Sequence, residues 1–169
     1  MRKKKLAVTL VLSGLLLCLI PIIIAIGFNA FEDYRLNQAR RGLELIEAGL
    51  PLPTDFRLIK TVPYDNSISA YGETCYYATD HLIMGASLPE MQALDTYESS
   101  LRSDGWLAGE IQYPRSRAFY LGENAVAVIT TIGPGDDTRD AVDYERLREQ
   151  FESVVFVRLE FQLPSTSEC

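Results

Sequence analysis

An unbroken run of uncharged, largely apolar residues from Leu6 to Phe28 is the feature that most limits what this chain can fold into. A helix of about 20 apolar residues spans the roughly 30 Å hydrocarbon core of a bilayer, because a helix satisfies its own backbone hydrogen bonds. Pro21 would kink such a helix, which membrane helices tolerate. The sequence therefore predicts a transmembrane helix over residues 6–28 that contacts the lipid bilayer.

The charges that flank this run predict its orientation. Residues 1–5 form a basic tail that carries Arg2, Lys3, Lys4 and Lys5, whereas Glu32 and Asp33 follow the run. Basic flanks stay in the cytoplasm. We therefore expect a single-pass protein of the cell membrane with a cytoplasmic N-terminus and an extracytoplasmic C-terminal domain.

Two alternatives compete with an uncleaved membrane anchor. Ala25-Ile26-Gly27 could serve as a signal-peptidase site, but the apolar region of a signal peptide has about 7–15 residues and this run is longer. An uncleaved anchor is favoured, and cleavage stays open. Cys18 could be a lipidated cysteine, but Leu17 occupies the position where lipidation needs a small residue. We interpret Cys18 as an apolar membrane residue.

Residues 29–53 predict a stalk helix followed by a Pro-rich hinge. Asn29 is a plausible N-cap, and Gly49 is a natural end for the helix. Each Pro in Leu50-Pro51-Leu52-Pro53 pushes its predecessor out of the helical region, so this segment should be extended. Apolar side chains recur at helical spacing between these limits, at Phe31, Tyr34, Ala39, Leu43, Ile46 and Leu50.

Residues 54–163 predict one extracytoplasmic α+β domain, and residues 164–169 a flexible tail. Ser87 and Glu90 have capping-box spacing, which predicts a helix over 88–104 with Leu88, Met91, Leu94, Tyr97 and Leu101 on its buried face. A second helix is expected over 136–151, with Ala141, Tyr144, Leu147 and Phe151 inward. Runs of β-prone residues predict strands at 56–62, 71–86 (bent at Asp80-His81), 106–113, 118–121, 125–132 and 155–163.

This order of elements is that of a ferredoxin-like (split βαβ) antiparallel sheet with two helices on one face. The last strand has the most regular pattern, because its inward residues alternate with Phe156, Arg158, Glu160 and Gln162; the inward residues are Val155, Val157, Leu159, Phe161 and Leu163. A slip of one residue would expose the whole apolar set, so the register of this strand is well specified.

The charge balance excludes a nucleic-acid partner. Residues 29–169 contain 12 Lys and Arg against 23 Asp and Glu, a net charge of −11. Nothing in such a domain would neutralise a run of phosphates. We expect a non-enzymatic docking, scaffold or accessory module whose partner is a membrane or envelope protein. The alternative is a small-molecule or ion sensor with a pocket between the sheet and the helix at 88–104.

Side chains that could catalyse a reaction or bind a ligand are sparse, and the sequence predicts no catalytic, cofactor or metal site. His81 is the only histidine, and one His with scattered Cys does not make a zinc site. Asp136, Asp137, Asp140, Asp143 and Glu145 lack the spacing of a calcium loop, so we interpret them as acids at a helix start. Arg115 and Arg117 could hold an anion, but a solvated turn is the simpler reading. Cys75 and Cys169 both lie outside the predicted membrane segment, so a disulfide between them is possible in an oxidising compartment.

Overall fold

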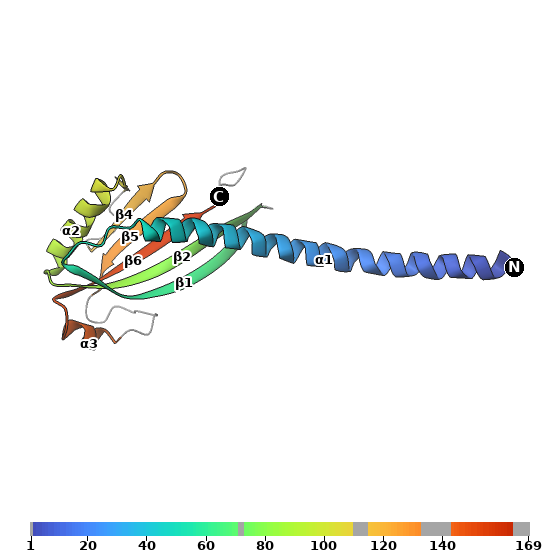
Figure 1. Ribbon diagram of the computed structural model, residues 1–169, viewed down its shortest axis with the longest axis horizontal. Helices are drawn as coiled ribbons and strands as arrows, with labels where there is room; N and C mark the ends of the chain where they lie inside the picture. Colours follow the sequence, from blue (N-terminus) through green and yellow to red (C-terminus); the bar gives the residue numbers. More distant parts are fainter. Residues whose placement is uncertain (1, 71–72, 110–114, 133–142, 164–169) are drawn as a thin grey trace. The chain divides into compact units, whose positions relative to one another are not determined.

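The computed structural model describes residues 2–70, 73–109, 115–132 and 143–163 (Figure 1). The chain divides into two compact units, Met1–Arg35 and Leu36–Cys169. A single helix, α1, runs from Arg2 to Ala48 and contributes to both units. Among the described residues, no helix is both long enough and apolar enough to cross a membrane.

The C-terminal unit is α+β, as predicted, and is built on one antiparallel sheet. Its strands are β1 (Phe56–Ala70), β2 (Glu73–Ala86), β3 (Leu107–Ala108), β4 (Ser116–Leu121), β5 (Ala125–Thr131) and β6 (Ser153–Gln162). Its other helices are α2 (Glu90–Ser103) and α3 (Tyr144–Arg148). The strand order across the sheet is β1-β2-β6-β5-β4-β3, and every neighbouring pair is antiparallel.

This order shows that the ferredoxin-like expectation was wrong. A ferredoxin-like sheet places the strand before the first helix beside the strand before the second helix, here β2 beside β5. Instead β6 lies between them and pairs with both. The outer side of β2 is occupied by β1, which was expected over 56–62 but continues to Ala70. The last strand therefore pairs with the inner side of β2.

The two sides of the sheet carry different helices. On one side, which we call the α1–α2 face, Ala39 and Leu43 of α1 and Leu94 of α2 pack with Leu82 and Val157 in the main core. On the other side, the α3 face, Leu147 packs with Ile83 and Val154. The expectation of two helices on one face was therefore wrong for the helix at 136–151. Its described part is only α3, on the opposite side, and residues 136–142 lie outside the described residues.

The predicted alternation of the last strand is confirmed. Val155, Val157 and Leu159 are buried in the main core, and Phe161 and Leu163 pack against it. The alternate positions face the other side, where Val154 is buried and Arg158 is exposed. The strand therefore holds the register that its apolar residues require.

At several helix ends, the residues that cap the helix differ from those that the sequence predicted. Asn29, expected as an N-cap, lies inside α1, whereas the helix does end at Ala48, just before Gly49. The N-cap of α2 is Pro89 without a side-chain cap, and the Ser87 hydroxyl donates to the carbonyl of Asp55. The predicted capping box was therefore wrong, although the predicted helix was confirmed. Leu94, Tyr97 and Leu101 of α2 are buried as expected, but Met91 is exposed and Ala93 takes the inward position.

Candidate functional site

A charged cluster joins α1 to the sheet. Along β2, Ala78, Leu82 and Met84 face the main core, and the period of a strand places Asp80 on the same side. The Asp80 side chain is 2% exposed, and its Oδ1 accepts a hydrogen bond from Nη1 of Arg40 at 2.5 Å. Arg40 follows the buried Ala39 on α1. A buried carboxylate without a compensating partner is strongly unfavourable, so Arg40 stabilises Asp80 at this depth.

Glu47 completes the cluster from the last turn of α1. It lies seven residues after Arg40, two helical turns later and on the same side of the helix. Oγ1 of Thr61 in β1 donates to Oε1 of Glu47 at 3.3 Å. Burial, followed by the nearby carboxyl of Asp80, raises the pKa of Glu47 above its usual value of 4.5. We call these residues the Arg40–Glu47–Asp80 cluster.

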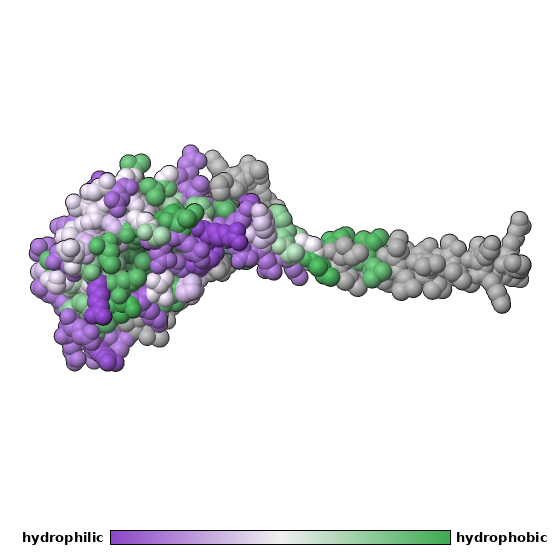
Figure 2. All heavy atoms as spheres, in the orientation of Figure 1, coloured by the Kyte–Doolittle hydropathy of each residue, from purple (hydrophilic) through white to green (hydrophobic). Residues whose placement is uncertain are grey.

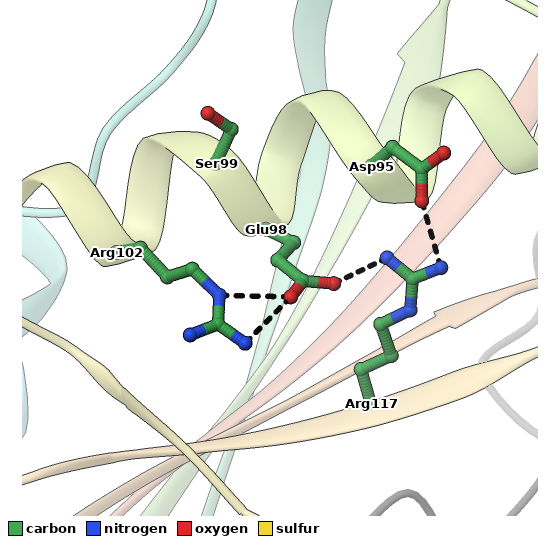
Figure 3. Close-up of a pocket in the computed structure, with 5 residues that line it drawn as sticks. All are labelled: Asp95, Glu98, Ser99, Arg102 and Arg117. Carbon is green, nitrogen blue, oxygen red and sulfur yellow. Dashed lines mark hydrogen bonds and ion pairs between the residues drawn. The ribbon is translucent and has the colours of Figure 1, made fainter.

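A shallow groove of about 410 Å³ lies between α2 and β4, and its lining is charged (Figure 3). Arg117 of β4 reaches Asp95 Oδ1 through Nη2 at 2.8 Å and Glu98 Oε2 through Nη1. Arg102 donates to the same Glu98 from Nε at 2.8 Å, and Ser99 lines the rim. Burial alone would lower the pKa of Arg117, but hydrogen bonds and charges from Asp95 and Glu98 outweigh it and raise that pKa. The charges of this groove therefore compensate one another.

The two predicted arginines are held in ion pairs with α2. Arg115 Nη2 lies 3.7 Å from Glu90 Oε2, in addition to the pairs of Arg117. Both side chains therefore join the sheet to α2, a role that their position on a predicted turn did not indicate.

His81 lies on the α3 face of β2, within a strand that is continuous rather than bent. Its ring is 4.6 Å from the ring of Tyr64 and 4.9 Å, edge to face, from that of Phe156. In the register of β2 with β6, it lies opposite Arg158. The neighbours of His81 thus include two aromatic rings and, in the strand register, an arginine.

The remaining candidates are partly described. Cys75 is disulfide-bonded, and Cys169, its predicted partner, lies outside the described residues. Asp143 accepts a hydrogen bond from the backbone N–H of Arg146 at 3.1 Å and caps α3, while Glu145 lies in its first turn. These two acids serve as helix-start residues, as the sequence predicted. The other predicted acids, Asp136, Asp137 and Asp140, lie outside the described residues, and the described residues contain no group of three metal-ligating side chains.

Sequence reasoning missed the Arg40–Glu47–Asp80 cluster. A signal was present, because Asp80 interrupts an otherwise apolar series with period two along β2. Arg40 likewise lies between Ala39 and Leu43 of the predicted helical stripe. Comparison with protein-family models, curated proteins and solved structures found no match to this chain.

Proposed function

We propose that the chain is a single-pass membrane protein, with residues 6–28 in the bilayer and the α+β domain outside the cytoplasm. The observation that carries the proposal is the run of 23 uncharged residues, which as a helix is about 35 Å long, enough for the hydrocarbon core. In α1, the described large apolar side chains of this stretch are 46–65% exposed, namely Leu19, Ile20, Ile24, Ile26 and Phe28. At 3.6 residues per turn these side chains cover more than half of the helix circumference, and Figure 2 shows hydrophobic residues on the described part of this stretch; such a wide apolar surface is typical of a helix in a hydrophobic environment.

Two independent features support the orientation. The basic tail at Arg2–Lys5 favours a cytoplasmic N-terminus. Cys75 is disulfide-bonded, and disulfides persist in oxidising compartments outside the cytoplasm. Cys169 is the proposed partner, because the N–H of Leu163 donates to the carbonyl of Tyr76, so the chain leaves β6 beside Cys75.

We propose further that the domain docks on another membrane or envelope protein through the α3 face of its sheet. Tyr64 and Tyr120 are 44% and 43% exposed on this face, and Arg158 is exposed between them in the strand order. Tyr77 is half-buried there, and burial followed by the charge of Glu160 raises its pKa. Exposed tyrosines and arginine are the residues that contribute most to protein interfaces.

The anchor is tested by extracting whole membranes with alkaline carbonate. The wild-type chain should remain in the pellet, and Leu16→Arg/Ile20→Arg should move to the supernatant, because each Arg costs about 3 kcal/mol at the centre of a membrane helix. Leu45→Arg is the matched control, since Leu45 is 78% exposed on the same helix but outside the run. Release of the wild-type chain, or equal release of both variants, would refute the anchor. A mature mass that lacks residues 1–27 would instead establish cleavage.

Docking is tested by photo-crosslinking in intact membranes from single probe sites. Probes at positions 120 and 158 lie on the α3 face, and a probe at Ser99 on the exposed side of α2 is the control. We expect one and the same membrane protein to be captured from 120 and 158 but not from 99. Equal capture from all three positions, or none from the α3 face, would contradict the docking proposal.

The sensor alternative is favoured only by the position of the groove beside α2, where a ligand pocket was expected. Asp95, Glu98, Arg102 and Arg117 pair with one another there, so a ligand would have to displace existing ion pairs (Figure 3). A small molecule that copurifies with the chain and is lost in Arg117→Met would establish the sensor.

A further inference from the structure

We propose that Phe28, Phe31 and Tyr34 form an aromatic arc on α1, which inserts into the lipid headgroup layer and determines the direction in which the helix tilts. The inference rests on the proposed anchor, which placed only residues 6–28 in the bilayer, and it extends the lipid contact to Tyr34. Every residue that carries the inference belongs to the unit Met1–Arg35.

The three aromatic side chains are exposed on the surface of α1. Phe28, Phe31 and Tyr34 are 58%, 55% and 59% exposed, and the last two follow the apolar run rather than belong to it. Neighbouring exposed apolar side chains mark an interaction site. Tyr rings settle at the headgroup level of a bilayer because one end of the ring is apolar and the other is polar, and Phe is typical of the lipid-facing side of interfacial helices. The lipid headgroup layer is therefore the partner that fits these rings.

The positions of the rings along the helix match the thickness of this layer. Phe28 ends the uncharged run, and Tyr34 lies six residues later, about 9 Å along the helix axis. The polar layer on each side of the hydrocarbon core is about 5–8 Å thick. A tilt shortens the projection of the helix on the bilayer normal, so the whole arc is brought within reach of the layer.

The rings and the acidic side chains of this segment lie on different sides of α1. At 3.6 residues per turn, Phe28, Phe31 and Tyr34 fall within an arc of about 120°, with Phe31 at its centre. The same geometry places the exposed Asp33 about 160° from Phe31, and Glu32 about 100° from it. An ionised carboxylate is costly to remove from water. The two sides of the segment therefore prefer different depths in the membrane.

This asymmetry selects one direction of tilt. The run of 23 uncharged residues forms a helix about 5 Å longer than the hydrocarbon core, and tilting accommodates such an excess. Interfacial anchors set the direction of the tilt. A tilt toward Phe31 lowers the rings into the headgroup layer and lifts Asp33 toward water. A tilt in the opposite direction would do the reverse to both groups.

The test compares the membrane depth of a spin label at positions 33 and 34, measured on the full-length chain in phosphatidylcholine vesicles. Depth is obtained from the collisions of the label with oxygen and with a water-soluble nickel complex. Asp33→Cys and Tyr34→Cys are labelled separately in a Cys18→Ser background, in which Cys75 is disulfide-bonded. The background without an added cysteine measures residual labelling.

The expected result is a reversal of chain order. Without a preferred direction of tilt, position 34 would lie about 1 Å farther from the bilayer centre than position 33. With the proposed direction and a tilt of about 20°, position 34 should lie about 1–3 Å deeper than position 33. Phe28 and Phe31 remain in both labelled chains, so the arc still selects the direction.

Two double variants test whether the rings cause the reversal. Phe28→Ser/Phe31→Ser removes the centre of the arc and should return the two depths to chain order. Leu19→Ser/Ile26→Ser is the matched control, because Leu19 and Ile26 are 48% and 64% exposed and lie about 120–140° from Phe31. The reversal should persist in this control.

Carbonate extraction of the same chains separates this inference from the proposed anchor. A chain that remains in the pellet while position 33 is the deeper of the two would overturn the arc alone. A reversal that persists in Phe28→Ser/Phe31→Ser would do the same. Release of the otherwise unchanged chain into the supernatant would refute the anchor and the arc together.

Discussion

Replacement of Arg40 by Met should destabilise the chain far more than the same replacement at Arg102, although both arginines form ion pairs with a carboxylate. Met retains the apolar length of the arginine stem and removes the guanidinium. At the first site the loss leaves Asp80 without its described cation at 2% exposure. At the second site it leaves Glu98, which is 22% exposed and retains Arg117.

The degree of burial determines how much stability each replacement should cost. Breaking a buried ion pair costs about 3–5 kcal/mol, because one charge stays desolvated without compensation. Arg40 is 17% exposed, so water screens part of the interaction and we expect the low end, about 3 kcal/mol. In the Arg102–Glu98 pair, the arginine is 53% exposed and the two residues lie one helical turn apart. Loss of this ion pair should therefore cost about 0.5 kcal/mol.

The assay is equilibrium unfolding of the full-length chain in micelles, followed by the fluorescence of Trp106. This is the only tryptophan of the chain, and it is 4% exposed in the main core, so its emission reports on that core. The cycle of Arg40→Met, Asp80→Asn and the double variant should give a coupling energy of about 1–3 kcal/mol. A coupling energy near zero, or equal losses for Arg40→Met and Arg102→Met, would refute the reasoning from burial.

Three further predictions concern packing, a buried phenol and the disulfide. Gly42→Ala should destabilise the chain by about 1–2 kcal/mol, because the new Cβ would overlap the ring of Phe161 and the cost of overpacking exceeds the gain in helix propensity; unchanged unfolding would contradict this contact. Tyr97→Phe should stabilise the chain by up to about 1 kcal/mol, because the buried Tyr97 hydroxyl has no hydrogen-bond partner among the described residues. Burial raises the pKa of Tyr97, so the wild type but not the variant should lose additional stability as the pH rises above about 10, and equal alkaline profiles would argue against this burial. Cys75 and Cys169 should resist alkylation until the chain is reduced, and Cys169→Ser should make Cys75 reactive; an unreactive Cys75 in that variant would exclude the pairing.

Residue patterns predicted the elements better than they predicted the arrangement. The register of β6 followed from Val155, Val157 and Leu159 alone, because only one placement of a strand with period two buries all three. The second half of β1 was missed, since Asp65, Asn66 and Ser67 are typical of a turn. They occur in a strand at the sheet edge, where one side lacks a described neighbouring strand and polar residues are common.

The candidate site was missed for a related reason. The sequence prediction placed a bend at Asp80-His81, where two polar residues interrupt a run rich in Tyr, Thr and aliphatic residues. The strand continues, and its period directs Asp80 toward the core and His81 away from it. An inward Asp requires a cation from another element, and a sequence does not show which helix covers that face. Arg40 could be identified only after α1 was found to lie on the sheet.

The single helix α1 meets two environments, and its side chains change pattern between them. From Leu19 to Phe28 the described apolar residues cover more than half of the helix circumference and are exposed. From Ala39 to Ile46 the apolar residues other than the exposed Leu45 occupy one side, which packs against the sheet, while Arg41 and Glu44 are exposed. A wide apolar surface suits lipid, and a one-sided helix suits a protein surface. The division of the chain into two units, between Arg35 and Leu36, falls within this change of pattern.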